Sequence, residues 1–366
     1  MSFFRRFGVL ALASTLSTSC LSDQDNNEPL AQYRAEISTN SPTLNGISIN
    51  GISINGISIN GISINGISIN GISINGISIN GISINGISIN GISINGTALD
   101  GLSLTNSKIS LKLPGTNKTL TGRDLIGMTA KISVPAQGSV LGQTYTMRID
   151  NVVQDTSNNF NDIWLYQVSY KADNSNSWQS LCSDYSGQPS PLTLVKGAYW
   201  NETTGARIDD AKAVTPACAE GAIGKCVILG YRPWATGSVC NGYGRHRDCN
   251  DVSLKEYHQA CTRMIRADYC GDGTAHTVNG TILDIFDYLS PPVQLQEEKW
   301  QMEARWTQTG ALCLSQRRHP EIPFPGCVKS GDKSKTPTYV QPPKCQAYST
   351  GDDRGLIVST FQSGTK

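Results

Sequence analysis

Apolar and polar residues alternate along five stretches of the chain, at residues 108–113, 128–134, 144–149, 164–170 and 300–306. Successive side chains of a β-strand point to opposite faces, so each stretch would present one apolar and one polar face. Glycine, proline and asparagine, which favour turns, lie between the stretches. The pattern predicts antiparallel sheets with one face on the core and the other in water.

One segment has the periodicity of a helix instead. Ser253 and Glu256 are spaced as a capping box, in which the hydroxyl and the carboxylate satisfy the first free backbone amides of a helix. Apolar residues then recur three or four positions apart, at Leu254, Tyr257, Cys261, Met264 and Ile265. Gly271 and Gly273 end the pattern. We expect one amphipathic helix that lies on the sheet, with Cys261 facing inward and forming a disulfide that holds it there.

A five-residue unit, Asn-Gly-Ile-Ser-Ile, occurs ten times in succession from Asn45 to Ile94, and degenerate copies continue to Ile109. In a straight strand an odd period would send the isoleucines of successive units to opposite faces. They share a face only if the chain bends once per unit, and Asn-Gly suits such a bend because both residues tolerate positive φ. The repeat predicts a β-solenoid with Ile-Ser-Ile sides and Asn-Gly corners.

This unit resembles the pentapeptide-repeat family, whose quadrilateral β-helices turn every five residues. It departs from that family at its first isoleucine, where the family usually has a small residue. Two alternatives stay open. Identical units allow the pairing register to slip, which would give an irregular segment, and an uncharged, Ile-rich, proline-free sequence also suits a steric zipper. We expect the segment to act as a stalk or a self-association element.

The N-terminus has the pattern of an export signal. Two arginines precede a mostly apolar stretch at residues 8–16, and small residues lead to Cys20. Cys20 is similar to the lipid-modified cysteine of bacterial lipoproteins, although Leu16 stands one position further from it than is usual. Cleavage after Ser19 without lipidation is the alternative. We therefore expect an outer-membrane lipoprotein or an extracellular protein.

Ten cysteines follow Cys20, and an even number in an exported chain indicates disulfides. No C-x-x-C pair occurs and the histidines do not cluster with cysteines, which argues against a zinc site. The simplest pairing hypotheses join sequence neighbours, Cys218 with Cys226 or Cys240 with Cys249. The disulfide candidates are Cys182, Cys218, Cys226, Cys240, Cys249, Cys261, Cys270, Cys313, Cys327 and Cys345.

The chain is thus predicted to divide into a signal peptide at 1–19, a polar tether at 20–44, the repeat at 45–109 and a disulfide-rich β domain at 110–366. The fold class is mainly β, with antiparallel sheets and one amphipathic helix, preceded by a solenoid-like or irregular repeat. Lys and Arg number 30 against 29 Asp and Glu, a net charge of +1. Nucleic-acid binding needs a clear basic surplus, so we expect no nucleic-acid partner, and membrane contact only through a lipid anchor.

The predicted helix ends in Ala267-Asp268-Tyr269-Cys270, followed by Gly271-Asp272-Gly273. Together with Trp164-Leu165-Tyr166, Tyr257-His258-Gln259-Ala260-Cys261 and Gly310-Ala311-Leu312-Cys313, this tetrapeptide resembles the ADYC domain, a bacterial family found in exported proteins. The resemblance extends from about Leu120 to Cys345 and leaves the repeat outside. It implies an exported domain without implying an activity, a ligand or a catalytic residue.

The tetrapeptide has a structural interpretation, which we favour. Cys270 would close a disulfide, and Tyr269 would pack on the sheet with its hydroxyl bonded. Asp268 would accept hydrogen bonds from backbone amides near the end of the helix. Gly271-Asp272-Gly273 would form a turn.

The functional interpretation places several carboxylates and a histidine around one pocket. Its candidates are Asp268, Asp272, Asp284, Asp287, His258 and His276. A carboxylate pair would serve acid–base hydrolysis. The oxygen-rich group would suit Ca²⁺, although the spacing is not that of an EF-hand. A hydrolase requires two or more of these side chains to converge in a concave pocket.

The sequence therefore favours a non-catalytic exported protein without a metal or other cofactor. Its disulfide-stabilised domain would be displayed beyond the repeat, tethered at Cys20, and would bind a cell-surface polymer or another protein. The alternative is a secreted hydrolase that acts through Asp268, Asp272, His258 and His276.

Overall fold

The computed structural model describes most of the chain from residue 88 onward, and short strands before it. The described residues are the strands at 39–40, 53–54, 57–59, 63–64 and 67–69, and residues 88–95, 97–134, 143–156, 160–184, 187–201, 204–241, 248–278, 281–322, 341–346 and 355–362. The predicted signal peptide, Cys20, most of the tether and repeat, and Cys327 lie outside them. Among the described residues, no helix is long and apolar enough to cross a membrane.

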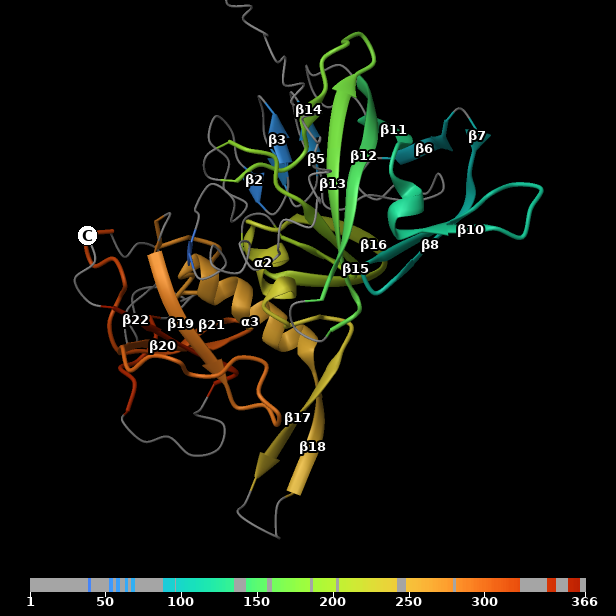
Figure 1. Cartoon of the computed structure of the whole chain (residues 1–366). Helices are drawn as coiled ribbons and strands as arrows, with labels where there is room; N and C mark the ends of the chain where they lie inside the picture. The colour runs from blue at the N-terminus through green and yellow to red at the C-terminus, as the bar shows by residue number, and fades with distance from the viewer. Residues whose placement is uncertain are drawn as a thin grey trace, which may run out of the picture.

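A large antiparallel sheet occupies the N-terminal half of the domain (Figure 1). Its strand order is β16-β15-β13-β12-β11-β6-β7, and β14 pairs with β13. The strands are β6 (Ser88–Ile94), β7 (Thr97–Ala98), β11 (Met128–Val134), β12 (Gln143–Asp155), β13 (Ile163–Ala172), β14 (Gln179–Ser180), β15 (Leu192–Trp200) and β16 (Arg207–Cys218). Three of the alternating stretches seen in the sequence thus form neighbouring strands of one sheet.

A smaller three-stranded sheet packs against the large one. It has the order β10-β9-β8 and leads into the 3₁₀ helix η1. Its elements are β8 (Asp100–Thr105), β9 (Lys108–Lys112), β10 (Thr119–Thr121) and η1 (Gly122–Leu125). Leu111 and Leu125 join Tyr145 and Tyr166 of the large sheet in one buried apolar cluster. The Tyr166 hydroxyl, which bonds β9 at Ile109 N (2.8 Å), ties the two sheets together.

Two helices lie between the large sheet and a third sheet (Figure 1). The helix α2 (Ala222–Ile228) contacts β15 and β16, and α3 (Leu254–Arg266) contacts the third sheet. The sequence predicted α3, including its N-cap Ser253, whose hydroxyl accepts a hydrogen bond from Lys255 N (3.3 Å). The expectation of a single helix was wrong. α2 is buried on every side, so it lacks the amphipathic stripe that identifies a helix in sequence.

The third sheet has the order β1-β19-β22-β20-β21, and a separate hairpin, β17-β18, precedes α3. Its members are β1 (Thr39–Asn40), β19 (Thr281–Asp287), β20 (Gln301–Thr307), β21 (Gly310–Leu314) and β22 (Ile357–Phe361), and the hairpin is β17 (Thr236–Asn241) with β18 (Asp248–Ser253). The main core cluster joins both helices to this sheet. On β20 most of the expected wet face is covered, because Glu303 and Arg305 are buried, 0% and 5% exposed, and only Gln301 is exposed.

Four short strands within the repeat pair in parallel with a fixed offset. Ser53 pairs with Ser63 and Ile57 with Ile67, so partners are two five-residue units apart. These strands are β2 (Ser53–Ile54), β3 (Ile57–Ile59), β4 (Ser63–Ile64) and β5 (Ile67–Ile69). A continuous solenoid is not shown and stays a prediction. The domain boundary at residue 110 also stays a prediction. The last perfect repeat units form β6, which pairs with β11 in antiparallel fashion.

Four disulfides are described, and they correct part of the pairing hypothesis. Cys240–Cys249 joins β17 to β18 as predicted, but Cys218–Cys226 was wrong. That prediction assumed that cysteines close in sequence are also close in space. Instead, Cys218 at the end of β16 bonds Cys182, and Cys226 on α2 bonds Cys261 on α3. The described bonds are Cys182–Cys218, Cys226–Cys261, Cys240–Cys249 and Cys313–Cys345. Cys270 is disulfide-bonded as well.

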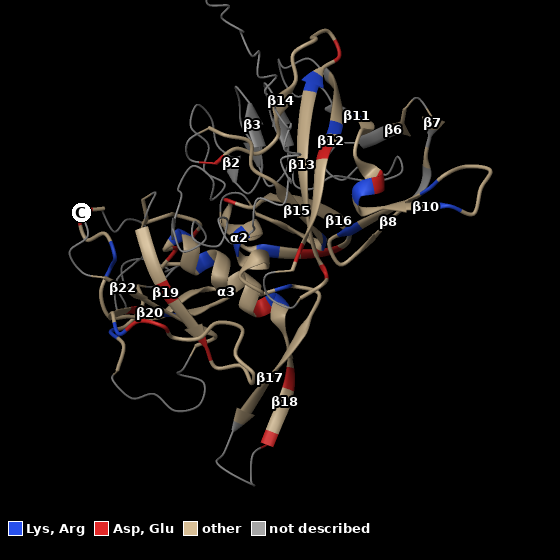
Figure 2. Cartoon of the chain, in the orientation of Figure 1, with Lys and Arg blue, Asp and Glu red and all other residues tan. Residues whose placement is uncertain are grey.

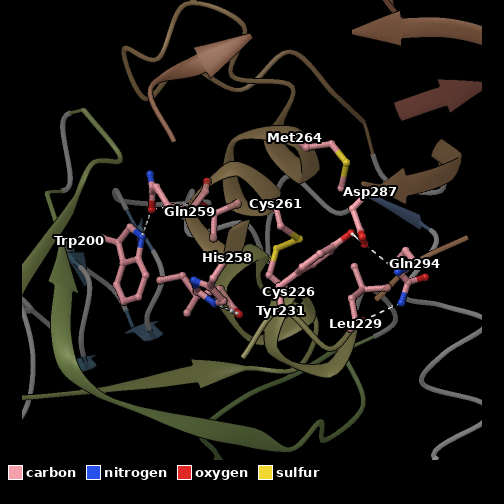
Figure 3. The surroundings of a disulfide bond; sticks show 12 residues. Trp200, Cys226, Leu229, Tyr231, His258, Gln259, Cys261, Met264, Asp287 and Gln294 are labelled. Atoms are coloured by element: carbon pink, nitrogen blue, oxygen red, sulfur yellow. Dashed lines mark hydrogen bonds between the residues drawn. A yellow bond between two sulfur atoms is a disulfide. The ribbon is translucent and has the colours of Figure 1, made fainter. Parts of the chain in front are cut away.

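The bond between Cys226 and Cys261 lies at the centre of the core (Figure 3). Both cysteines are fully buried, so the prediction that Cys261 faces inward is confirmed. The bond connects α3 to α2, not to a strand as expected, because α2 lies between α3 and the large sheet. A disulfide of this kind contributes on the order of 2–4 kcal/mol, mainly by restricting the unfolded chain.

Candidate functional site

The Ala-Asp-Tyr-Cys tetrapeptide begins at the residue that ends α3. Ala267 adopts the left-handed conformation (φ 52°) and turns the chain onto the β20-β21 hairpin. The Tyr269 carbonyl accepts a hydrogen bond from Ala311 N at 3.0 Å. Gly271 has φ +70°, and a Cβ there would lie 1.7 Å from the Thr309 carbonyl oxygen. Only glycine therefore fits where the motif meets the hairpin.

Tyr269 belongs to a buried polar network, as the structural interpretation predicted in part. Its ring stacks on Trp306 with centroids 5.4 Å apart, and its hydroxyl donates to Glu303 Oε1 at 2.6 Å. Burial and the nearby Glu303 carboxylate raise the pKa of Tyr269 well above its usual value. Arg318 donates to both carboxylate oxygens of Glu303 at 2.6 Å, and Ser359 donates at 2.7 Å. The sequence did not predict this network, which fixes the motif to the third sheet.

Asp268 is completely buried and pairs with a cation from the last turn of α3. Its Oδ2 accepts hydrogen bonds from Arg263 Nη1 and from Gly273 N, the latter at 3.0 Å. The bond to a backbone amide was predicted, whereas the ion pair was not. Burial raises the pKa of Asp268, and the charges of Arg263 and Arg266 oppose that shift. The signal for the pair was present, since basic residues in the last turn of a helix preceded an acidic residue just beyond it.

His276 and Asp272 lie close to Asp268 but have structural partners. His276 Nδ1 contacts the Ala267 carbonyl at 3.1 Å, and its ring lies 5.6 Å from that of Tyr269. Burial lowers the pKa of His276. Asp272 Oδ1 accepts a hydrogen bond from Thr274 N at 2.8 Å, which forms the predicted turn.

Asp284 and Asp287 on β19 instead hold the loop that follows that strand. Asp284 accepts hydrogen bonds from the amides of Glu297 (3.3 Å) and Glu298 (3.0 Å). Asp287 accepts from the Tyr231 hydroxyl at 2.9 Å and from several loop amides (Figure 3). Both carboxylates thus accept hydrogen bonds from residues outside the tetrapeptide.

His258 lies in the main core, in the first half of α3, whereas the tetrapeptide follows the end of that helix. Its Nε2 contacts the Ile223 carbonyl of α2 at 3.0 Å, and its ring lies 5.6 Å from that of Trp200. Burial lowers its pKa to about 3, so the ring is neutral at physiological pH. The functional alternative grouped six acid–base side chains around one pocket, but His258, Asp284 and Asp287 bond other parts of the fold. In the part of the chain that is described, no group of three His, Cys, Asp or Glu side chains could hold a metal ion.

A polar pocket of about 380 Å³, which we call the α3 pocket, opens beside the tetrapeptide. It lies between the start of β16, one side of α3 and the turn that joins β20 to β21. Its lining is Ala206, Arg207, Asp209, Lys255, Glu256, Gln259, Arg263, Gln308 and Thr309. Charged residues of both signs are visible along α3 in Figure 2. Sequence reasoning missed this pocket because its lining comes from three distant segments.

The charges of the α3 pocket are organised in pairs. Asp209 accepts from Arg207 Nε and from Lys255 Nζ, both at 2.8 Å. Partial burial would raise the pKa of Asp209, but the hydrogen bonds from Lys255 and Arg207 lower it overall. Arg263, which pairs with Asp268, also donates from Nε to the Gln308 carbonyl at 3.3 Å. The buried aspartate of the tetrapeptide therefore positions a side chain in the wall of the pocket.

Comparison with known proteins identifies the domain. No curated protein and no solved structure matches the chain significantly. The family model described as the ADYC domain matches residues 122–320, more than half of the chain. The matched region includes α3, the tetrapeptide, the α3 pocket and three of the described disulfides. The chain therefore belongs to the ADYC domain family.

Proposed function

We propose that this protein is an exported binding module, and that its α3 pocket holds a segment of a cell-surface polysaccharide. Export is supported by the disulfides, since such bonds form and persist in oxidising compartments outside the cytoplasm. In this proposal Cys20 carries a lipid anchor and the repeat serves as the stalk. The domain would then face the polymers of the cell surface.

The observation that carries the proposal is the mixed lining of the α3 pocket. Guanidinium and ammonium donors, two carboxylates, two amides and the Thr309 hydroxyl line one concave surface. A sugar hydroxyl both donates and accepts a hydrogen bond, so a chain of sugars suits a lining that offers both. The internal pairing of Asp209 with Arg207 and Lys255 neutralises much of the charge. The pocket therefore favours a neutral or weakly acidic polymer over a highly charged one.

Rigidity of the lining also supports a binding role. The Arg263 guanidinium is held by Asp268, the Thr204 carbonyl and the Gln308 carbonyl, and its side chain is only 4% exposed. Gln259 is held by Trp200 Nε1 at 2.7 Å and by the Gly205 carbonyl at 2.9 Å (Figure 3). Side chains that are fixed before binding lose little conformational entropy when a ligand arrives.

Calorimetric titration of the oxidised protein with dextran, which is neutral, and with polygalacturonate, which has a carboxylate on every sugar, tests the proposal, and dextran should bind more tightly. Gln308→Trp should block the pocket and weaken binding at least tenfold, because residue 308 lies exposed in its lining. Gln296→Trp, at an exposed position outside the lining, is the matched control and should bind like the parent. No binding of either polymer, or equal binding by both variants, would rule the proposal out. Release of new reducing ends from either polymer would instead favour the hydrolase alternative.

A further inference from the structure

A second cavity, distinct from the α3 pocket, lies between the large sheet and the three-stranded sheet. It has a volume of about 100 Å³ and is partly open to solvent. We call it the sheet cavity. Residues from both sheets line it, among them Leu104 of β8, Met128 of β11, Met147 of β12, Val168 of β13 and Leu194 of β15. The walls thus combine aliphatic side chains from strands that are far apart in the sequence.

The two polar residues in this lining, Tyr166 and Arg148, make their polar contacts with other parts of the fold. The Tyr166 hydroxyl donates to the Ser107 carbonyl at 3.1 Å and accepts from Ile109 N at 2.8 Å. The Arg148 guanidinium bonds Asp150 through Nε at 2.5 Å and lies 4.2 Å from the centre of the Trp178 ring. A ligand in the sheet cavity would therefore meet hydrocarbon surface. A polar ligand would lose its hydrogen bonds to water on entering without replacing them.

From this lining we infer that the sheet cavity is a binding site for the end of an alkyl chain. Cavities lined by aliphatic side chains stay dry, and one of roughly 150 Å³ binds benzene or xenon. The cavity is somewhat smaller and partly open, so a chain end would enter while the polar part of the molecule stays outside. The described large hydrophobic side chains that are exposed are Ile126, Val278, Ile282 and Leu295, and none lines the cavity. Among the described residues, no strongly exposed large hydrophobic side chain therefore extends the lining into a patch that a protein partner would cover.

The methionines allow a direct test by nuclear magnetic resonance with ¹³C-labelled methionine methyl groups. Met128 and Met147 line the cavity, whereas Met264 and Met302 do not and serve as internal controls. Xenon and a series of 1-alkanols from butanol to decanol are the probes. We expect saturable shifts of the Met128 and Met147 signals with both kinds of probe, and unchanged Met264 and Met302 signals.

A filling variant identifies the site. Ala130→Leu places a larger side chain in the cavity lining and should weaken probe binding at least tenfold. Ala172→Leu makes the same change on β13 outside the lining and should bind as the parent does. If Ala130→Leu does not fold, Val214→Leu from the β16 wall takes its place. The inference fails if Met128 and Met147 do not respond, if they respond to xenon but to no alkanol, or if the filled and control variants respond equally.

Discussion

Acidification should destabilise this protein through one buried histidine, His258. Its ring lies in the core between α2, α3 and Trp200, with Nε2 against the Ile223 carbonyl. Burial, assisted by the positive charge of Arg207, lowers its pKa to about 3. In the unfolded chain the same side chain has a pKa of about 6.5. The two states therefore differ in bound protons across a wide range of pH.

The sign of the effect follows from that difference. Between about pH 6.5 and pH 3 the unfolded chain binds a proton at this position and the folded protein does not. The free energy of unfolding is therefore undiminished above pH 6.5 and falls as the pH drops through this range. At pH 5 the loss is about 2 kcal/mol, from ~1.5 pH units at ~1.4 kcal/mol each. That value depends on the unfolded pKa, because the folded pKa already lies below 5.

Urea unfolding of the oxidised protein at pH 7.5 and pH 5, compared with that of His258→Gln, measures this contribution. Glutamine keeps an amide that can donate to the Ile223 carbonyl but does not titrate, so the variant should lose about 2 kcal/mol less than the parent between the two pH values. All other titrating groups are common to both proteins and cancel in the difference. If parent and variant lose stability equally, to within about 0.5 kcal/mol, the reasoning is refuted.

Two further predictions concern the residues that hold the tetrapeptide. Glu303→Gln should lower the free energy of unfolding by about 3–5 kcal/mol, because it leaves the buried Arg318 charge without its carboxylate. Adding Arg318→Met should recover much of that loss in denaturant titrations, and a single-variant cost below about 1 kcal/mol would contradict the argument. Gly271→Ala should be far more destabilising in thermal unfolding than Gly127→Ala. Both glycines have positive φ, but only at residue 271 would a Cβ collide with the Thr309 carbonyl. Equal melting temperatures for the two variants would contradict this prediction, because they would show that the backbone at residue 271 can move away from the Thr309 carbonyl without loss of stability.

Local patterns predicted much of the secondary structure. All five alternating stretches form strands, and the capping box located the start of α3 at its N-cap Ser253. The helix ends at Arg266, before the glycines that were expected to stop it. The alternation and the capping box can be read from neighbouring residues alone, because the direction of a side chain in a strand or helix depends only on its position along that element. The same reasoning failed for β20, where Glu303 and Arg305 were expected in water. A polar residue in an alternating run is exposed only if no other part of the chain covers that face.

The candidate site was less predictable. Sequence reasoning picked out Asp268 and Tyr269 and assigned them structural roles, which their contacts bear out. Its functional alternative grouped Asp268 with residues that bond other parts of the fold, namely Asp284, Asp287 and His258. The grouping relied on closeness in sequence and on chemical type. Neither closeness in sequence nor chemical type tells which backbone amide or carbonyl will be the hydrogen-bond partner of a side chain in the folded protein.

What the amino-acid sequence determined by itself was five of the strands, the helix α3, the cysteine content that accompanies export, and the family. Each of these depends on residue type and short-range spacing. The tertiary structure alone decided that Cys226 bonds Cys261, that Arg263 pairs with Asp268, and that two cavities of opposite character form. Those features join residues that are distant in sequence or face each other across a turn. Their free energies depend on distances and burial that exist only after the sheets and helices have packed.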